Sequence, residues 1–249
     1  NIGAGLVKLG KKVLLLDLDP QANLTISLGI PRQKVTIYEN MRGEAEIQPF
    51  IVKEGLEVVT SSLDLSGAEM ELINEAGREY ILRELFEPLQ EEYDFIIIDC
   101  PPSLGLLTLN ALTTSDYVVI PMQTEFLALQ GLAKIKQITD KVRFRLNKKL
   151  TIGGVIATMY DSRKVLNRDI VTTIKKYFGD KVFETMIREN VALAEAPAQH
   201  KDIFEYQPNS NGAHDYLELA KEMSERLEKA TTTEGDSKNH RTASTVTHQ

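Results

Sequence analysis

Short, almost entirely apolar runs recur along this chain and alternate with stretches of helical periodicity. The runs lie at residues 13–16, 56–60, 93–98, 117–121 and 151–157, with a shorter one at 181–183. A strand that is apolar on both faces belongs in a parallel sheet covered by helices on both sides. Helical patterns at residues 78–90, 105–114, 127–146, 165–178 and 211–230 supply that cover. The sequence therefore predicts an α/β fold with a doubly wound, mostly parallel sheet.

Length and composition narrow the class of protein further. The chain has 249 residues, of which 42% are hydrophobic and 26% charged, and this suits one large domain over residues 1–230. Its single cysteine, Cys100, excludes a disulfide framework and a cysteine-rich metal site. The apolar runs are far shorter than the ~18 residues of a membrane-spanning helix, and no signal peptide is evident, so a cytoplasmic location is expected. Residues 231–249 are rich in Ser and Thr and are predicted to form a disordered polar tail.

Carboxylates follow two of the strand-like runs. Asp17 and Asp19 come directly after the first run, and Asp99 follows four apolar residues, which is the Walker B pattern. Because the carboxyl ends of parallel strands meet at one edge of a sheet, we expect these three side chains to share a site. Such carboxylates can hold Mg²⁺-bound water or polarise an attacking water, although acids at strand ends also cap helices. Pro101 and Pro102 stop the strand after Asp99 and stiffen the following loop.

Positive charge is concentrated in one segment of an otherwise acidic chain. Residues 134–188 hold 14 Lys and Arg against 5 Asp and Glu, a local net charge of +9, whereas the whole chain carries −7. This asymmetry indicates a basic face on an acidic body. A chance cluster on solvated helices would give the same count.

Several motifs in a fixed order resemble the ParA/Soj family of partition ATPases, within the MinD/ParA class of deviant Walker ATPases. They are residues 1–6, 16–23, 99–104, 108–112, 119–123, 158–161, 188–197 and 211–213. The resemblance covers about residues 1–229, and motifs in the right order are far more specific than any one alone. It identifies residues 1–230 as a P-loop NTPase-like domain that binds ATP and Mg²⁺.

The resemblance also implies roles for individual residues. Asp19 matches the switch I aspartate that positions the attacking water, and Asp99 matches the Walker B aspartate that reaches Mg²⁺. Asp17 is expected in the water shell of the Mg²⁺. The loop after Asp99, with Pro101, Pro102 and Ser103, corresponds to switch II. Residues on loops that surround the adenine in relatives are Met159, Arg188, Asn190 and Pro208.

Two departures from the family pattern stand out. The P-loop K-G-G-x-G-K-[ST] and the first strand precede, in relatives, the stretch with which this chain begins, so the sequence is expected to start after them. Ala192 stands where many relatives carry a basic residue implicated in DNA contact. DNA binding is therefore expected to rest more on other cations, which are either Arg188 and Lys201 or Arg163, Lys164, Arg168, Lys175 and Lys176.

The resemblance implies an ATPase that drives chromosome or plasmid segregation in the cytoplasm, associated with the nucleoid. Its implied partners are a ParB-type centromere-binding protein, non-specific DNA and a second copy of itself when ATP is bound. A MinD-like cell-division ATPase and a cargo-positioning relative are the alternatives. The MinD reading requires a basic amphipathic C-terminal helix, but residues 211–230 are acidic, so no membrane partner is expected. The iron protein of nitrogenase would need more cysteines.

Overall fold

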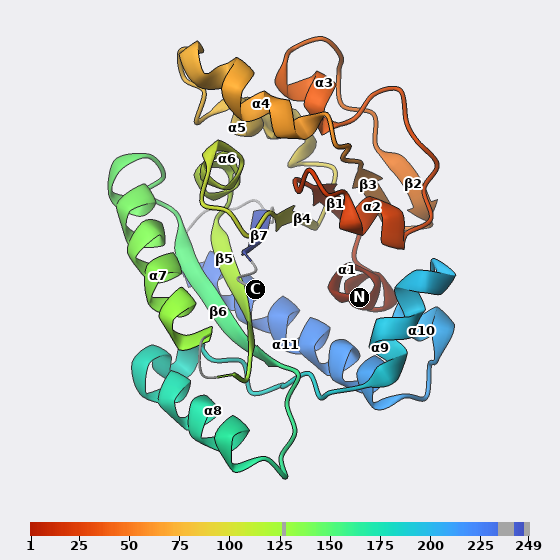
Figure 1. Cartoon of the computed structure of the whole chain (residues 1–249), viewed down its shortest axis with the longest axis vertical. Helices are drawn as coiled ribbons and strands as arrows, with labels where there is room; N and C mark the ends of the chain where they lie inside the picture. Colours follow the sequence, from red (N-terminus) through yellow and green to blue (C-terminus); the bar gives the residue numbers. More distant parts are fainter. Residues whose placement is uncertain (126–127, 234–241, 247–249) are drawn as a thin grey trace.

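A single twisted sheet organises the chain, of which the computed structural model describes residues 1–125, 128–233 and 242–246 (Figure 1). Within these residues the strand order is β2-β3-β1-β4-β7-β5-β6. The strands are β1 Val13–Asp17, β2 Phe50–Lys53, β3 Leu56–Val59, β4 Phe95–Cys100, β5 Tyr117–Gln123, β6 Thr151–Thr158 and β7 Thr242–Val246. All neighbours run parallel except β2 and β3, which confirms the predicted mostly parallel α/β sheet.

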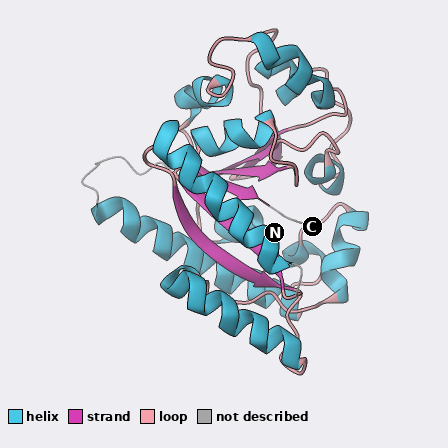
Figure 2. Ribbon diagram, turned by 60° about the vertical axis from the view of Figure 1, so that its left-hand side comes forward, coloured by secondary structure: helices cyan, strands magenta, loops and turns pink. Residues whose placement is uncertain are grey.

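Helices cover both faces of the sheet, as the view in Figure 2 shows. The longer helices are α1 Ile2–Lys8, α4 Leu65–Glu71, α5 Ile81–Phe86, α6 Leu106–Thr114, α7 Ala128–Arg145, α8 Val165–Phe178 and α11 Asn211–Thr233. The shorter ones are α2 Asn23–Ser27, α3 Ile37–Met41, α9 Val191–Glu195 and α10 Ile203–Tyr206, with 3-10 turns η1 Leu72–Asn74, η2 Glu87–Leu89, η3 Gly179–Lys181 and η4 Ala196–Gln199. No helix in the described part of the chain has the length and apolar character needed to cross a membrane.

Successive residues of a strand pack into two separate hydrophobic cores, one on each face of the sheet, because side chains alternate between the faces. Leu14 and Leu16 of β1 pack with helices α3 to α8, whereas Val13 and Leu15 pack with α1 and α11. The same alternation runs through β4, so both faces of the central strands are buried. Helix α1 lies so close to α11 that a Cβ at Gly5 would sit 2.9 Å from the Cβ of Ala220. Burial on both faces explains why these strands read as continuous apolar runs.

Two local predictions differ from the structure. The short apolar run at residues 181–183 does not form a strand: Lys181 ends η3, and Val182 forms an isolated bridge with Val155. The edge strand β2 was not predicted. It pairs antiparallel with β3 through a tight turn at Gly55, whose φ of +79° favours glycine.

The prediction of a disordered tail over residues 231–249 is wrong for part of that segment. Residues 231–233 continue α11, and β7 inserts between β4 and β5, parallel to both. The composition argument missed this because backbone pairing on two sides does not require apolar side chains, and threonine is a good strand former. The remainder of the predicted tail, at 234–241 and 247–249, lies outside the described residues.

Candidate functional site

The expected carboxylates meet at one edge of the sheet. Asp17 ends β1 and Asp99 lies directly opposite it in the neighbouring strand β4, as register partners. Asp19 follows two residues later, in the loop that leads to α2. The predicted convergence of three acids at the carboxyl edge is therefore present in the structure. These acids belong to elements far apart in sequence, and the parallel register brings them together.

Asp17 is fully buried, and both of its carboxylate oxygens are occupied. Its Oδ2 accepts hydrogen bonds from the backbone N–H and the hydroxyl of Thr25, at 2.8 and 2.7 Å. Its Oδ1 accepts from the backbone N–H of Asp19 at 3.3 Å. Burial raises the pKa of Asp17, against these bonds, which lower it. Asp17 thus fixes the loop that carries Asp19. Its hydrogen-bond donor Thr25 was not predicted from the sequence.

Asp99 is the least compensated acid of the group. No hydrogen bond to its carboxylate is found among the described residues, and its pKa is raised to about 7. The causes are burial first, then the charges of Asp17 and Asp19. A cation placed at this edge would relieve both the desolvation and the like-charge repulsion. The site therefore favours a bound divalent ion.

Asp19 is held at the mouth of the site by its neighbours. Its carbonyl accepts a hydrogen bond from the Ser61 hydroxyl at 2.8 Å, and its carboxylate Oδ1 accepts from the backbone N–H of Gln21 at 2.9 Å. Ala22, just beyond, adopts a left-handed φ of +53°. Since Asp19 is half-buried and on a braced loop, its second carboxylate oxygen is available to a water molecule at the edge of the sheet.

The loop after Asp99 carries the predicted switch II residues. Pro101 is buried, and Pro102 and Ser103 are exposed. The Ser103 carbonyl accepts a hydrogen bond from the hydroxyl of Thr108 at 2.6 Å, which ties the loop to α6. Cys100 is buried and its thiol pKa is raised well above the ordinary value by burial, so it is a packing residue.

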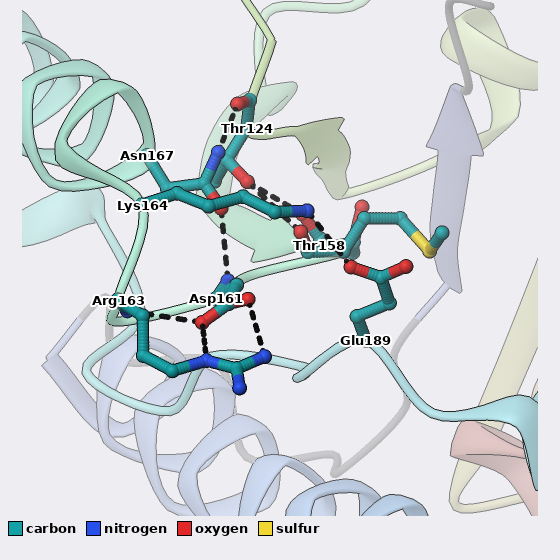
Figure 3. Close-up of polar contacts among 8 residues, drawn as sticks. Thr124, Thr158, Asp161, Arg163, Lys164, Asn167 and Glu189 are labelled. Carbon is teal, nitrogen blue, oxygen red and sulfur yellow. Dashed lines mark hydrogen bonds and ion pairs between the residues drawn. The ribbon is translucent and has the colours of Figure 1, made fainter.

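A second polar cluster lies at the carboxyl end of β6, on the same edge of the sheet (Figure 3). Asn167 of α8 joins the cluster together: its Oδ1 accepts from the Asp161 N–H at 2.9 Å, and its Nδ2 donates to the Thr124 carbonyl at 2.7 Å. The Thr124 hydroxyl in turn donates to the carbonyl of Met159. Met159 has a left-handed φ of +53° and is 50% exposed. Buried Thr124 and Asn167, neither of which was predicted, therefore shape the loop that presents Met159.

The other predicted base-contacting residues differ in how the structure places them. A bridge pairs Tyr160, next to Met159, with Arg188. The Arg188 guanidinium forms a two-pronged ion pair with buried Asp215, at 2.6 and 2.9 Å, which raises the pKa of Arg188. Asn190 caps α9 by accepting the Ala192 N–H at 2.9 Å. Pro208 lies in an exposed turn after α10.

Removing the Asn167 side chain is expected to loosen the Met159 loop. Asn167→Ala leaves the Asp161 N–H and the Thr124 carbonyl without their partner, and each lost buried bond costs about 1–1.5 kcal/mol. We expect a loss of about 2–3 kcal/mol in the free energy of unfolding, measured by chemical denaturation. Thr172→Ala, on the exposed face of the same helix, is the control and should change it by less than about 0.5 kcal/mol. Equal effects of the two variants would contradict the role of Asn167.

Ion pairing divides the predicted DNA-contacting cations into two groups. Four of them are engaged by carboxylates: Arg163 by Asp161, Lys164 by Glu189, Lys175 by Glu184 and Arg188 by Asp215. The Arg163 pair is bidentate, and it lowers the pKa of Asp161 to about 2 (Figure 3). Arg168 donates to the Ser162 carbonyl, and Lys176 and Lys201 have no ion pair within the described residues. Net charge alone gave no sign of this division.

Metal-binding side chains are sparse. The described residues contain no group of three or more His, Cys, Asp or Glu placed to hold a metal ion. Asp99, with Asp17 behind it, is an all-oxygen donor set of the kind that Mg²⁺ accepts while keeping most of its waters. The residues present therefore fit a Mg²⁺ ion held largely by water and by a bound phosphate group.

Known proteins resemble this chain over nearly its whole length. The family model described as an AAA domain matches residues 1–152. The sporulation initiation inhibitor protein Soj of Bacillus subtilis is 46% identical over 228 residues, which cover 90% of each chain. The chromosome-partitioning ATPase Soj of Treponema pallidum is 44% identical, covering 90% of this chain and 89% of its own. Cobyrinic acid a,c-diamide synthase from Mycobacterium smegmatis, solved with ADP and magnesium, superposes with a TM-score of 0.78 at 33% identity, covering 96% of this chain and 90% of that one.

Proposed function

The chain belongs to the ParA/Soj family of partition ATPases, and on that premise we propose that it binds ATP with Mg²⁺ and hydrolyses it to drive chromosome segregation. The observation that carries the proposal is the register pairing of Asp17 with Asp99, with Asp19 two residues beyond. Chromosome rather than plasmid segregation is favoured because a relative 44% identical over 90% of this chain is named for chromosome partitioning.

Each carboxylate has a separate part in this proposal. Asp99 would hold the Mg²⁺ ion, because its carboxylate has no hydrogen-bond partner among the described residues and its pKa is raised by burial and by the charges of Asp17 and Asp19. Asp17 lies behind it, in the proposed water shell of the ion, and also fixes the loop through Thr25. Asp19 orients the attacking water from that braced loop. When bound, Mg²⁺ supplies charge neutralisation to the phosphate oxygens.

The adenine end of the nucleotide is proposed to lie over the Met159 loop. Met159 offers a half-exposed, polarizable side chain at the carboxyl end of β6, on the same sheet edge as the acids. The Arg188–Asp215 pair and the Asn190 cap support this, because they hold the backbone that leads away from the Tyr160–Arg188 bridge. Arg188, Asn190 and Pro208 are the remaining proposed contacts to the nucleotide.

The proposed cycle couples the nucleotide to DNA through a second copy of the chain. ATP-bound dimers bind nucleoid DNA without sequence specificity, and a ParB-type partner stimulates hydrolysis and release. DNA binding of this kind needs clustered Lys and Arg but no base-reading side chains. Pairing the proposed DNA-contacting cations of two copies would add avidity, so ATP would control DNA binding through dimerisation. The cytoplasm and the nucleoid are the proposed location.

Steady-state turnover tests the proposed function. In a chain that carries the family P-loop ahead of Asn1, phosphate release should require Mg²⁺ and rise with non-specific duplex DNA and a ParB-type partner. Absence of Mg²⁺-dependent turnover under all of these conditions would contradict the proposal.

Reversing charge at the start of α8 is expected to abolish DNA binding and to leave basal ATP turnover intact. The variant Arg163→Glu, Lys164→Glu, Arg168→Glu replaces three cations with acids and leaves Asp161 and Glu189 without their partners. We expect a loss of affinity of at least about 10²-fold, since binding is driven by counterion release. The measurement is fluorescence anisotropy of a non-specific duplex over a salt titration.

The matched control carries the same change of charge at cations outside the basic segment 134–188. Arg32→Glu, Lys34→Glu, Arg83→Glu should lower DNA affinity by less than about 5-fold, because only long-range electrostatics changes. If both triple variants lose affinity equally, overall charge explains the effect and the α8 assignment is wrong.

A further inference from the structure

A basic groove lies between α7 and α8, away from the carboxylate site. It encloses about 240 Å³ between the second half of α7, the last turn of α8 and the start of β6. Figure 1 shows the two helices next to one another beside β6. The lining residues used below are Lys136, Arg143, Leu150, Ile152, Phe178 and Lys181.

Cations dominate the rim of this groove. Lys136 pairs with Asp140, which also lines the groove and is its one carboxylate among the described lining residues. The Lys181 ammonium donates to the Ile152 carbonyl at 3.0 Å. For the Arg143 guanidinium, the described residues provide no hydrogen bond or ion pair. With three cations and one acid, the rim has a net positive charge that an anionic partner can neutralise.

The floor of the groove is apolar. Leu150 is buried, while Ile152 and Phe178 are half-buried and pack against the main core. Tyr177, which lines the groove, is 79% exposed. An exposed aromatic ring that continues an apolar floor extends the apolar surface that a partner protein can cover.

The groove faces the amino end of the sheet. Helix α7 ends at Arg145 and the chain enters β6 at Thr151, so this rim lies at the beginning of β6. Asp17, Asp99 and the Met159 loop all lie at the opposite, carboxyl edge. An occupant of the groove would therefore not compete with a nucleotide at the carboxylate site.

We propose that this groove docks an acidic peptide segment of a partner protein, with one apolar side chain of the segment seated on the Leu150, Ile152 and Phe178 floor. The acidic residues of the segment pair with Lys136, Arg143 and Lys181. The volume is smaller than that of a pocket for a drug-sized ligand, and it suits a single anchoring side chain. The Tyr177 side chain at the mouth then covers the anchor and excludes water.

The apolar floor distinguishes this occupant from nucleic acid. A DNA backbone would pair with the rim cations but has nothing apolar to place on the floor. A peptide that combines acidic residues with an apolar anchor complements both the cationic rim and the apolar floor. The interaction is also separate from the DNA contacts proposed above, which involve none of the three rim cations.

A labelled probe peptide tests the proposal on the 249-residue chain. The probe is the octapeptide DDELEEDD with a fluorescent label, read by anisotropy, against DDEGEEDD, which lacks the single apolar anchor. We expect binding in the range of about 10–100 μM, and at least about 10-fold weaker binding without the anchor. Lys136→Glu, Arg143→Glu should weaken binding of the probe at least about 30-fold, because attraction at the rim becomes repulsion.

Lys134→Glu, Lys141→Glu is the matched control, since it places the same charge change on exposed positions of α7 outside the groove. It should alter probe affinity less than about 3-fold. Equal loss in both double variants, or equal binding of the two peptides, would overturn the proposal in favour of simple charge attraction. A loss of duplex DNA affinity in Lys136→Glu, Arg143→Glu as large as the loss for the probe would assign the groove to DNA instead.

Discussion

Asp19→Ala is expected to remove ATP hydrolysis while leaving ATP binding and dimerisation in place. The side chain lies on a loop held by Asp17, Ser61 and Gln21, and its backbone anchors survive truncation of the carboxylate. What is lost is the group that orients water, which typically costs on the order of 10²-fold or more in rate. The measurement is phosphate release in a chain with the family P-loop, alongside dimer mass by light scattering with ATP.

Two further variants sharpen this test. Asp64→Ala, an exposed acid at the start of α4, is the control and should turn over ATP at the unmodified rate. Asp19→Asn keeps the shape and the hydrogen bond from Gln21 but removes the charge, so it should be nearly as inactive as Asp19→Ala. Unchanged turnover in Asp19→Ala would remove Asp19 from the mechanism. Loss of dimerisation along with turnover would make Asp19 a structural residue of the loop.

Asp99→Asn is expected to stabilise the nucleotide-free chain at pH 8 while abolishing Mg²⁺-nucleotide binding. The Asp99 carboxylate is charged at that pH despite burial and the neighbouring charges of Asp17 and Asp19, which together raise its pKa to about 7. Removing that charge should add about 2–4 kcal/mol to the free energy of unfolding. For a domain of this size the gain is roughly 5–10 °C in Tm.

The pH dependence of the effect has a definite sign. An unfolded aspartate has a pKa of about 3.9, whereas folded Asp99 has a pKa of about 7. Between these pH values the folded chain keeps a proton that the unfolded chain has released. The contribution of Asp99 to stability is therefore complete below about pH 4 and is lost as the pH rises to about 7. Asp99→Asn should flatten the stability profile in that window.

Thermal denaturation of both proteins from pH 4 to pH 8 provides the measurement. Glu92→Gln, an exposed charge removal just before β4, is the control and should shift Tm by less than about 2 °C. If Asp99→Asn lowers Tm at pH 8, its carboxylate is compensated by neighbouring groups and the proposed preference for a bound cation is wrong.

The pKa of Asp161 is shifted in the opposite direction, to about 2. Its contribution to stability is therefore present above about pH 4 and is lost as the pH falls toward about 2.

Local sequence patterns were sufficient for much of the fold. The strands β1, β3, β4, β5 and β6 were predicted because burial on both faces demands continuous apolar runs, and that demand is visible residue by residue. The meeting of Asp17, Asp19 and Asp99 at one edge was predictable for a similar reason: parallel strands that end in acids bring those acids to the same side of a sheet.

Other features depended on contacts between distant parts of the chain. The pairing of Arg163 with Asp161 and of Lys164 with Glu189 is decided by loop geometry, so a charge count over residues 134–188 overstates the free positive charge. Thr25 donates a hydrogen bond to Asp17, and Asn167 donates one to the carbonyl of Thr124. Both bonds depend on ångström-scale positions that composition does not encode.

The placement of β7 illustrates the same limit at the level of the whole sheet. Residues 242–246 look like a polar tail when judged by composition, yet they pair between β4 and β5. Hydrophobic patterning indicates which side chains will be buried, and the sequence by itself determined that pattern. Backbone hydrogen bonding is common to all residues, so only the tertiary structure decided which segment completes the sheet.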